Sequence, residues 1–444
     1  MNEHDKPALI RKLSKRHAKA ACALADAIAG YAELGFQEIQ SADAMKTFLE
    51  TRGFQVVFPW PHLPTAFKAT RGEGKPDYAL LAEYDALPNC GLKPGETGHG
   101  CGHNLLGASA ALAAVVAAEA LQQTVTPGRI TLWGCPAEEL LAGKAYMARN
   151  GAFRGHAAVF AWHPSVRSGV HHPGGAAIDS VRYAFTGRTA HGANAHQGRS
   201  ALDAVILLDV AANYLREHIP DNVRIHMCIP EGGDAPNVVP AHATGWYYVR
   251  GHDRAQVDAI RKRLDACAKG AAMATETRLR ITRETGIHQR LRNEALSHLI
   301  LDNLKTFGPP KVLASDRKRL RDLGLPDHIN TTLDERLHTV AGKASSDEDS
   351  VSWLSPLGRL NLVTRASNTA GHHRDTTVQV TLPLAHRGLQ RAAEVLAGSI
   401  LDLATDPKRQ AAVLAEFRKG TRGFHYDPLV PTKPPSLRPT ASGE

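Results

Sequence analysis

The sequence predicts an α/β protein with a second, smaller α+β domain inserted into it. Strands alternate with helices up to residue 176, and the core strands are continuous apolar runs. Both features are typical of a sheet that helices cover on both faces. The pattern changes near Gly174 and returns after about residue 287. A chain of 444 residues is long enough for two domains of common size.

The first segment, residues 1–176, carries most of the predicted sheet. Periodicity and turn residues predict helices over 8–31 and 41–52, strands over 54–58, 65–69 and 78–82, a helix over 105–121, a strand over 130–133, a helix from about 142 and a strand over 157–162. Gly53 follows the second helix, where a C-cap residue is expected. The alanine-rich stretch 105–121 is interpreted as a buried helix, because its apolar run is too short to span a bilayer.

The second segment, residues 177–287, has the order βαββαβ of a compact ferredoxin-like domain. The expected elements are a strand over 180–185, a helix over 200–218, strands over 223–229 and 244–249, a helix over 253–269 and a strand over 277–282. We therefore expect an insertion into the first domain.

The third segment, residues 288–420, is assigned back to the first domain. A helix over 294–306, β-like stretches over 360–364 and 377–382, and a long helix over 389–403 are expected. Residues 421–444 contain proline, lysine and serine without a periodic pattern, so they are expected to form a disordered tail.

Composition excludes several classes of function. With 43% hydrophobic and 22% charged residues the chain has a globular composition, and it begins with charged residues instead of an apolar signal segment. The net charge of +9 is scattered and not interleaved with aromatic residues, which argues against nucleic-acid binding. The six cysteines show no paired spacing, so we expect reduced thiols and a cytoplasmic enzyme without a membrane segment.

Metal-binding side chains follow the predicted strands. The strand over 78–82 leads to Glu83 and Asp85, and the glycine-rich loop after it holds Cys101 and His103 two residues apart. Thiol and imidazole are the usual ligands of borderline-soft divalent ions. Two such residues alone are also consistent with a buried cysteine and a loop histidine that share no role.

Three further strand ends or loops supply candidate ligands. Glu138 and Glu139 follow the strand over 130–133, His163 follows the next strand, and His372 lies in a distant loop. One of two adjacent carboxylates could bind a metal while its neighbour accepts a proton from water. Glutamate pairs are common on solvated surfaces and the chain has 23 histidines, so only the combination is informative. Together these residues are enough for two ions with an open position for water.

These segments resemble motifs of a known family. They are Glu83-Tyr84-Asp85-Ala86-Leu87-Pro88, Gly98-His99-Gly100-Cys101-Gly102-His103-Asn104, Pro136-Ala137-Glu138-Glu139, Trp162-His163-Pro164, Gly198-Arg199-Ser200-Ala201-Leu202-Asp203-Ala204 and Ala235-Pro236-Asn237-Val238-Val239-Pro240. The sequence resembles the co-catalytic zinc peptidases and amidohydrolases, which include aminoacylases, carboxypeptidase G, hippurate hydrolase and auxin-conjugate hydrolases. It is most similar to the B-subunit type of p-aminobenzoyl-glutamate hydrolase, from about residue 31 to the helix near Leu389.

The resemblance implies a zinc-aminopeptidase-like catalytic domain with a mixed sheet, and a lid domain that also dimerises. It implies two divalent ions per chain, zinc or manganese with cobalt as a further option. The implied ligands are Cys101, His103, Glu139, His163 and His372. Glu138 is the implied general base and His191 the implied oxyanion-stabilising residue of the lid, often acting across the dimer, while Asn237 and Arg250 are implied to bind substrate.

The function implied is hydrolysis of a small N-acyl, aminoacyl or aminobenzoyl amino acid conjugate with a free carboxylate, by a homodimer or with a homologous second subunit. Two alternatives stay open: hydrolysis of another C–N bond with release of ammonia, and a catalytically silent structural subunit. The chain departs from the family after His372, where it has His373-Arg374-Asp375, so either histidine could be the last ligand. It also departs within 345–353, where an acidic residue is shifted by one position.

Overall fold

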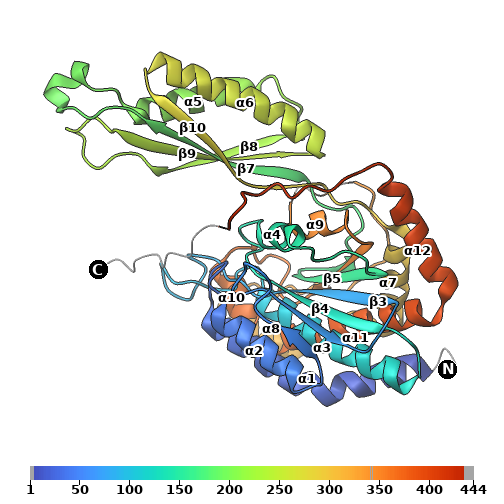
Figure 1. Cartoon of the computed structure of the whole chain (residues 1–444). Coiled ribbons are helices and arrows are strands. Elements are labelled where there is room, and N and C mark those ends of the chain that lie inside the picture. Colours follow the sequence, from blue (N-terminus) through green and yellow to red (C-terminus); the bar gives the residue numbers. More distant parts are fainter. Residues whose placement is uncertain (1–4, 341, 343, 435–444) are drawn as a thin grey trace.

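The computed structural model describes residues 5–340, 342 and 344–434, and it contains a large and a small sheet (Figure 1). The large sheet has eight strands in the order β1-β2-β4-β3-β5-β12-β6-β11, and the small one has four in the order β10-β7-β9-β8. The chain enters the small sheet at Ala177 and leaves it at Ile287. Figure 1 shows this sheet and its two helices standing apart from the larger domain.

The strands have the following bounds: β1 Gln55–Val57, β2 Phe67–Arg71, β3 Asp77–Glu83, β4 Arg129–Cys135, β5 Ala158–Ser165, β6 Ser168–Val170, β7 Ala177–Thr186, β8 Arg224–Glu231, β9 His242–Gly251, β10 Arg278–Ile287, β11 Leu333–Asp334 and β12 Leu357–Val363. The helices are α1 Asp5–Tyr31, α2 Ile39–Glu50, α3 His103–Gln123, α4 Gly143–Arg149, η1 Gly192–Gln197, α5 Ala201–Arg216, α6 Arg254–Ala274, α7 Glu294–Phe307, α8 Ala314–Asp322, α9 Glu348–Val351, α10 Arg374–Gln379, α11 Pro383–Thr405 and α12 Pro407–Gly420.

The large sheet is mixed, and its central strands β4, β3, β5 and β12 are parallel. Their carboxyl ends therefore lie along one edge, which is where open α/β sheets gather their chemistry. The small sheet is antiparallel throughout, and its order is that of a ferredoxin-like domain. The predicted class, a mixed α/β domain with an inserted α+β domain, is confirmed.

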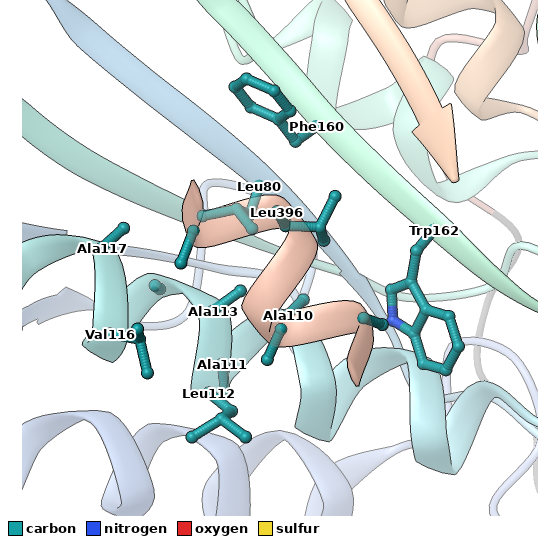
Figure 2. Packing of buried hydrophobic residues seen from close by; sticks show 14 of the residues in the cluster. Leu80, Ala110, Ala111, Leu112, Ala113, Val116, Ala117, Phe160, Trp162 and Leu396 are labelled. Atoms are coloured by element: carbon teal, nitrogen blue, oxygen red, sulfur yellow. The ribbon is translucent and has the colours of Figure 1, made fainter. Parts of the chain in front are cut away.

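Both faces of the large sheet are covered. Along β3, Leu80 packs into the larger core cluster, and its neighbour Leu81 packs into a second cluster on the opposite face, as the alternation of a strand requires. Figure 2 shows the first face, where α3 and Leu396 of α11 pack against Leu80, Phe160 and Trp162. The indole nitrogen of Trp162 donates a hydrogen bond to the carbonyl of Leu106 at 3.1 Å.

Helix α3 is the central element of this core. Its length and apolar composition would suit a membrane span, but 94% of its most apolar window is buried inside the protein. The alanines at 110, 111 and 113 are fully buried and allow α1 and α11 to approach closely. The interpretation of 105–121 as a buried helix is therefore confirmed.

One local prediction is wrong. Residues 377–382, expected to be β-like, are not a strand: 377–379 form the end of α10 and 380–382 a turn after it. The N-cap of α10, His373, accepts a hydrogen bond from the backbone of Asp375 at 3.2 Å. Helix capping overrides the β preference of the Thr and Val residues in this stretch. The structure also adds α12 and α8, for which no element was predicted.

The expected disordered tail is wrong for residues 421–434, and residues 435–444 lie outside the described part of the chain. Tyr426 and Val430 are buried, and Arg149 donates hydrogen bonds to the carbonyls of Pro428, Val430 and Pro431. This segment lacks periodicity because it docks in extended form, with buried side chains at irregular intervals.

His288, the residue after the last strand of the lid domain, packs against this docked segment. Its ring lies 5.4 Å from the ring of Phe424 and 5.6 Å from that of Tyr426, and the residue is 8% exposed. Burial, with a smaller contribution from the charge of Arg254, lowers the pKa of His288 to about 4. The folded protein therefore keeps this imidazole neutral across a pH range in which the unfolded chain takes up a proton.

We predict that His288 makes the folded protein less stable as the pH falls from about 6.5 to about 4. In this window the unfolded state binds more protons, so the free energy of unfolding decreases with falling pH, by about 3 kcal/mol from this one group. A His288→Phe variant should lack this component in urea denaturation curves recorded at several pH values. His298→Phe, on the exposed side of α7, is the control and should follow the wild type. Parallel curves for His288→Phe and wild type would show that His288 is not the titrating group.

Candidate metal centre and active site

A tight turn before α3 presents Cys101 and His103. Gly102 between them has a φ of 90°, a left-handed conformation that glycine adopts without strain, and His103 is the first residue of the helix. A Cβ at Gly102 would also lie 3.1 Å from Pro164. The turn is therefore compact enough to bring the thiol and the imidazole to the end of β5.

Glu138 and Glu139 follow β4, and Ala137 directly before them has a strained backbone conformation. Ala137 has a φ of 55°, which is unfavourable for alanine, and its backbone N–H donates a hydrogen bond to Glu38 Oε1 at 2.8 Å. Glu38 is fully buried and also accepts a hydrogen bond from Thr65. This carboxyl group holds the backbone in the conformation that turns both glutamates toward the end of the sheet.

His163, near the end of β5, has its ring fixed by a backbone carbonyl. Its Nδ1 lies 2.7 Å from the carbonyl oxygen of Pro164, and Arg365 donates to the same oxygen at 3.2 Å. If Nδ1 carries the proton for this bond, Nε2 keeps its lone pair, and it lies 3.2 Å from Cys101 Sγ. Burial, with the charge of Arg359 second, lowers the pKa of His163 well below its usual value, so the imidazole is neutral.

His372 reaches the same place from a distant part of the chain. Its φ is 55°, its backbone N–H donates to the carbonyl of Gly100 at 2.9 Å, and its Nε2 lies 3.5 Å from Glu139 Oε2. The neighbouring His373 caps α10 instead. Of the two histidines that the sequence left as alternatives, His372 is the one that faces the cluster.

The candidate ligand atoms form three groups, and within each group the atoms all lie within 4.8 Å of one another. The groups are Cys101 with His103 and His163, Cys101 with Glu139 and His372, and Glu83 with His103 and Glu138. Cys101 belongs to two of these groups, so its sulfur lies between an imidazole pair and a carboxylate–imidazole pair. The structure thus brings together all five predicted ligands and the predicted base.

The donor atoms fit divalent ions. His103 Nε2 and Glu139 Oε1 are buried and have no hydrogen-bond partner among the described residues. A buried polar atom without a partner costs about 1–3 kcal/mol, and a bound cation would remove this cost. Sulfur, nitrogen and oxygen donors in this number suit two ions of the zinc or manganese type.

Asp85 orients His103. Its Oδ1 lies 2.8 Å from His103 Nδ1, and its Oδ2 accepts the backbone N–H of Glu139 at 2.8 Å. Carboxylates commonly fix metal-binding histidines in this way. Burial acts to raise the pKa of Asp85, but the neighbouring His103 lowers the pKa below its usual value overall.

A buried lysine balances the carboxylates next to the cluster. Lys144 Nζ lies 2.6 Å from Glu83 Oε1 and 2.5 Å from Asp347 Oδ1, and its side chain is fully buried. Glu83 Oε2 in turn lies 3.5 Å from His103 Nε2. The two acidic residues that follow Asp347, in the segment that departs from the family, form ion pairs with arginines. Glu348 pairs with Arg290 and Arg359, and Asp349 pairs with Arg290.

Glu138 lies in an environment that favours its protonated form. Burial raises the pKa of Glu138 well above its usual value, and the carboxylate of Glu83 adds to the rise. Burial likewise raises the pKa of Glu139 to about 7, although His103 opposes this shift. A buried carboxyl group with a raised pKa can accept a proton and then donate it.

The predicted lid residues lie at two different ends of the lid sheet. His191 precedes η1, forms an isolated bridge with Val238 and is exposed, and Asn237 is exposed beside it. Arg250 lies at the other end of β9, opposite Ile178. The ten residues of β9 span roughly 30 Å, so Arg250 and His191 occupy opposite ends of the lid sheet. In Figure 1 the green segment around η1 projects away from the large sheet.

Sequence reasoning assigned no supporting role to four residues beside the cluster: Asp85, Lys144, Asp347 and Arg365. Asp85 was visible two residues after Glu83 at a strand end, but no metal-ligand spacing identified its role. Lys144, Asp347 and Arg365 are separated from their partners by tens to hundreds of residues, and a single lysine or arginine carries no signal of burial.

A family model describing the M20 peptidase dimerisation domain matches residues 171–276. The B-type subunit of p-aminobenzoyl-glutamate hydrolase from Escherichia coli K12 is 33% identical over 426 residues, which cover 86% of this chain and 89% of that protein. The Xaa-Arg dipeptidase of Homo sapiens is 31% identical over 309 residues, covering 64% of this chain and 68% of that protein.

Solved structures agree on the fold. A dinuclear metal binding peptidase from Bacillus subtilis is 19% identical and superposes with a TM-score of 0.59, covering 88% of this chain and 100% of the other. An aminobenzoyl-glutamate utilization protein from Klebsiella pneumoniae is 18% identical with a TM-score of 0.62, covering 88% of this chain and 97% of the other.

We predict that replacing Lys144 by methionine lowers the free energy of unfolding of the metal-free protein by about 3–5 kcal/mol. The change leaves the buried carboxylates of Glu83 and Asp347 facing each other without a cation. Urea denaturation would measure the loss, and Lys144→Met combined with Asp347→Asn should recover part of it. The control Lys46→Met removes two surface ion pairs and a cation–π contact with Phe58, and it should cost less than about 1 kcal/mol. Equal effects of the two single variants would contradict the assignment of Lys144 as a buried counter-charge.

Proposed function

Because this chain belongs to the M20 peptidase family, whose named members hydrolyse amide bonds of small conjugates, we propose that it is a metal-dependent amidohydrolase. Its substrate is a small N-acyl, aminoacyl or aminobenzoyl amino acid. The observation that carries the proposal is the convergence of Cys101, His103, Glu139, His163 and His372 beside Glu138.

The five side chains would hold two divalent ions, zinc or manganese, with cobalt as a further option. Such ions, when bound, acidify water and polarise a carbonyl group. Glu138 Oε2 lies 3.8 Å from His103 Nε2, so its carboxyl group borders the ligand atoms. Glu138 would take a proton from the attacking water and pass it to the nitrogen of the leaving amine, as its raised pKa favours.

Arg250 would bind the carboxylate of the leaving amino acid, because a guanidinium can hold a carboxylate through two parallel hydrogen bonds. His191 would stabilise the oxyanion, with Asn237 beside it near the substrate. The position of His191 at the far end of the lid sheet supports a role across a dimer, in which the lid of one protomer reaches the cluster of the other. The match of residues 171–276 to a dimerisation domain supports the same arrangement.

The proposed partner is a second copy of this chain, bound through the lid domain. The alternative partner is a homologous second subunit, because the Escherichia coli relative is named as one subunit of its enzyme. All six cysteines are free thiols, which supports the proposed cytoplasmic setting.

The alternative of ammonia release receives no support from the geometry. It was motivated by His373, Arg374 and Asp375, but His373 caps α10, Asp375 lies in the first turn of that helix, and Arg374 donates to the carbonyl of Leu92 at 3.1 Å. A silent structural role is disfavoured because the cluster keeps every ligand together with Glu138.

We predict that Glu138 and Glu139 separate catalysis from metal binding. Glu138→Ala should reduce hydrolysis of N-acyl amino acids by about 10²–10⁴-fold while metal content stays near that of the wild type. Glu139→Ala should lose metal as well as activity. Metal analysis of both purified variants decides between the roles. Loss of metal in Glu138→Ala, with metal retained in Glu139→Ala, would mean that the two roles are exchanged.

We predict that Glu138→Ala and His191→Ala chains complement each other in mixed dimers. If His191 acts across the dimer, each mixed dimer has one intact site, so an equal mixture regains about a quarter of wild-type activity per chain. If His191 acts within its own chain, every site in the mixture is defective and activity stays at the level of the single variants. The activity of refolded or co-expressed mixtures measures this directly, and each variant alone is the control.

A further inference from the structure

The inserted lid domain is joined to the large domain by two connections, and one short segment holds both of them. The chain enters the lid through residues 174–176, before β7, and returns through residues 288–291, after β10. Residues 344–353, which include α9, contact both connections and are named the hinge segment. On the entering side, the N–H of Ala176 donates a hydrogen bond to the carbonyl of Ala344 at 2.9 Å.

On the returning side, the hinge segment makes two further hydrogen bonds. The N–H of Leu291 donates to the hydroxyl of Ser352 at 2.8 Å, and the indole N–H of Trp353 donates to the carbonyl of Gln289 at 2.7 Å. Rotation of the lid about its two connections would therefore have to move the hinge segment or break these hydrogen bonds.

Arg290 is the charged residue of the returning connection. It is 6% exposed, its Nε lies 2.6 Å from Asp349 Oδ1, and its Nη2 pairs with Glu348 Oε1. Arg359 on β12 shares Glu348 Oε1 at 2.7 Å. Two guanidinium groups thus balance two buried carboxylates. Such pairs are directional, because the guanidinium group is planar and presents its donors in fixed directions.

The entering connection packs against both members of the Arg290–Asp349 pair. A Cβ on Gly174 would lie 2.5 Å from the Cβ of Arg290, and a Cβ on Gly175 would collide with Asp349 Oδ2. Arg290 belongs to the returning connection and Asp349 to the hinge segment. Three separate pieces of the chain therefore meet at one ion pair.

The hinge segment also contacts the charges next to the metal cluster. Asp347, two residues before Asp349, lies 2.5 Å from Lys144 Nζ. Lys144 pairs with Glu83 at 2.6 Å, and Glu83 lies beside His103 at 3.5 Å. The same short segment thus touches the connections of the lid on one side and the surroundings of the cluster on the other.

We propose that Arg290, Glu348 and Asp349 form a clamp that fixes the angle between the lid and the metal cluster. Arg290 is a positioning residue: it acts through the lid, which it keeps where the lid and the cluster hold one substrate together. The proposal rests on the amidohydrolase function above and adds the means by which the lid is held for it. Both acids lie within 345–353, where the chain departs from the family pattern, so the resemblance does not imply this clamp.

The first test measures kcat and KM of metal-loaded variants with an N-acyl amino acid. Arg290→Met combined with Asp349→Asn removes one positive and one negative charge together, and Glu348 keeps Arg359 as its partner. Without the clamp the lid samples further angles, so KM should rise about tenfold as the fraction of binding-competent chains falls. The value of kcat should stay within about twofold and the metal content should not change. Arg290→Lys, which keeps the charge without the planar pair, should lie between this double variant and the wild type.

Arg129→Met combined with Asp77→Asn is the matched control. It removes an Arg–Asp pair of 2.6 Å at the amino ends of β3 and β4, at the opposite edge of the sheet from the cluster, and should keep the KM of the wild type. A loss of folded protein would lower kcat without raising KM, so the two constants separate a positioning role from a structural one. An unchanged KM in the Arg290 and Asp349 double variant would overturn the proposal while leaving the hydrolase function intact.

A distance measurement separates the clamp from the function on which it rests. Spin labels at Lys269→Cys on α6 and Lys408→Cys on α12 report the angle between the lid and the large domain. The metal-loaded, labelled chains are diluted into unlabelled ones, and the other accessible thiols are replaced by alanine: Cys22, Cys228 and Cys267. Pulsed EPR should give one narrow distance distribution for the parent and a distribution at least about twofold broader for the double variant. This outcome would support the clamp even if no amide were hydrolysed, and equal distributions would overturn it whatever the enzyme hydrolyses.

Discussion

Buried negative charge at the carboxyl ends of β3 and β4 is the constraint on which the rest of the structure depends. Glu83, Asp85, Glu138, Glu139 and Asp347 lie in one region, and Lys144 is the buried lysine among them. Unpaired buried carboxylates cost several kcal/mol each, so one ammonium group cannot balance five of them. Protonation of Glu138 removes part of this cost, because burial and then the carboxylate of Glu83 raise the pKa of Glu138 well above its usual value. The sulfur and imidazole donors beside the carboxylates are placed to hold cations that would offset the rest.

The parallel core of the large sheet is what makes such a concentration of charge possible. Because β4, β3, β5 and β12 all point the same way, residues separated by hundreds of positions end at one edge. The closest approaches require special backbone: Gly102 with its left-handed conformation, and Ala137 and His372, which adopt it without being glycine. Strain of this kind costs about 1–3 kcal/mol per residue and is retained where the surroundings fix the geometry. Here the carboxyl group of Glu38 and the carbonyl of Gly100 supply that fixation.

The sequence was sufficient to predict the main strands and helices of both domains and the residues with distinctive chemistry. Apolar runs such as 78–82 and 130–133 are buried on both faces, so their composition predicts them without knowledge of their neighbours. Short elements were missed or misassigned because tertiary contacts decide them: α10 depends on the His373 cap, and residues 421–434 depend on pockets formed by other segments. The same reason explains why Lys144 and Arg365 escaped notice. Their importance lies in distant partners, which a linear pattern does not record.

The proposed site explains how the scattered positive charge of the chain would assist binding of an anionic substrate. A net charge of +9 attracts anions over distances of about a Debye length, which suits a substrate that carries a carboxylate. Arg250 lies opposite Ile178 on β7, at the end of the lid sheet where the chain enters from the large domain. A substrate whose carboxylate binds Arg250 while its carbonyl group lies at the metal cluster would contact both domains at once. Such binding would favour closure of the lid over the scissile bond, since the affinity gained on closure requires both contacts.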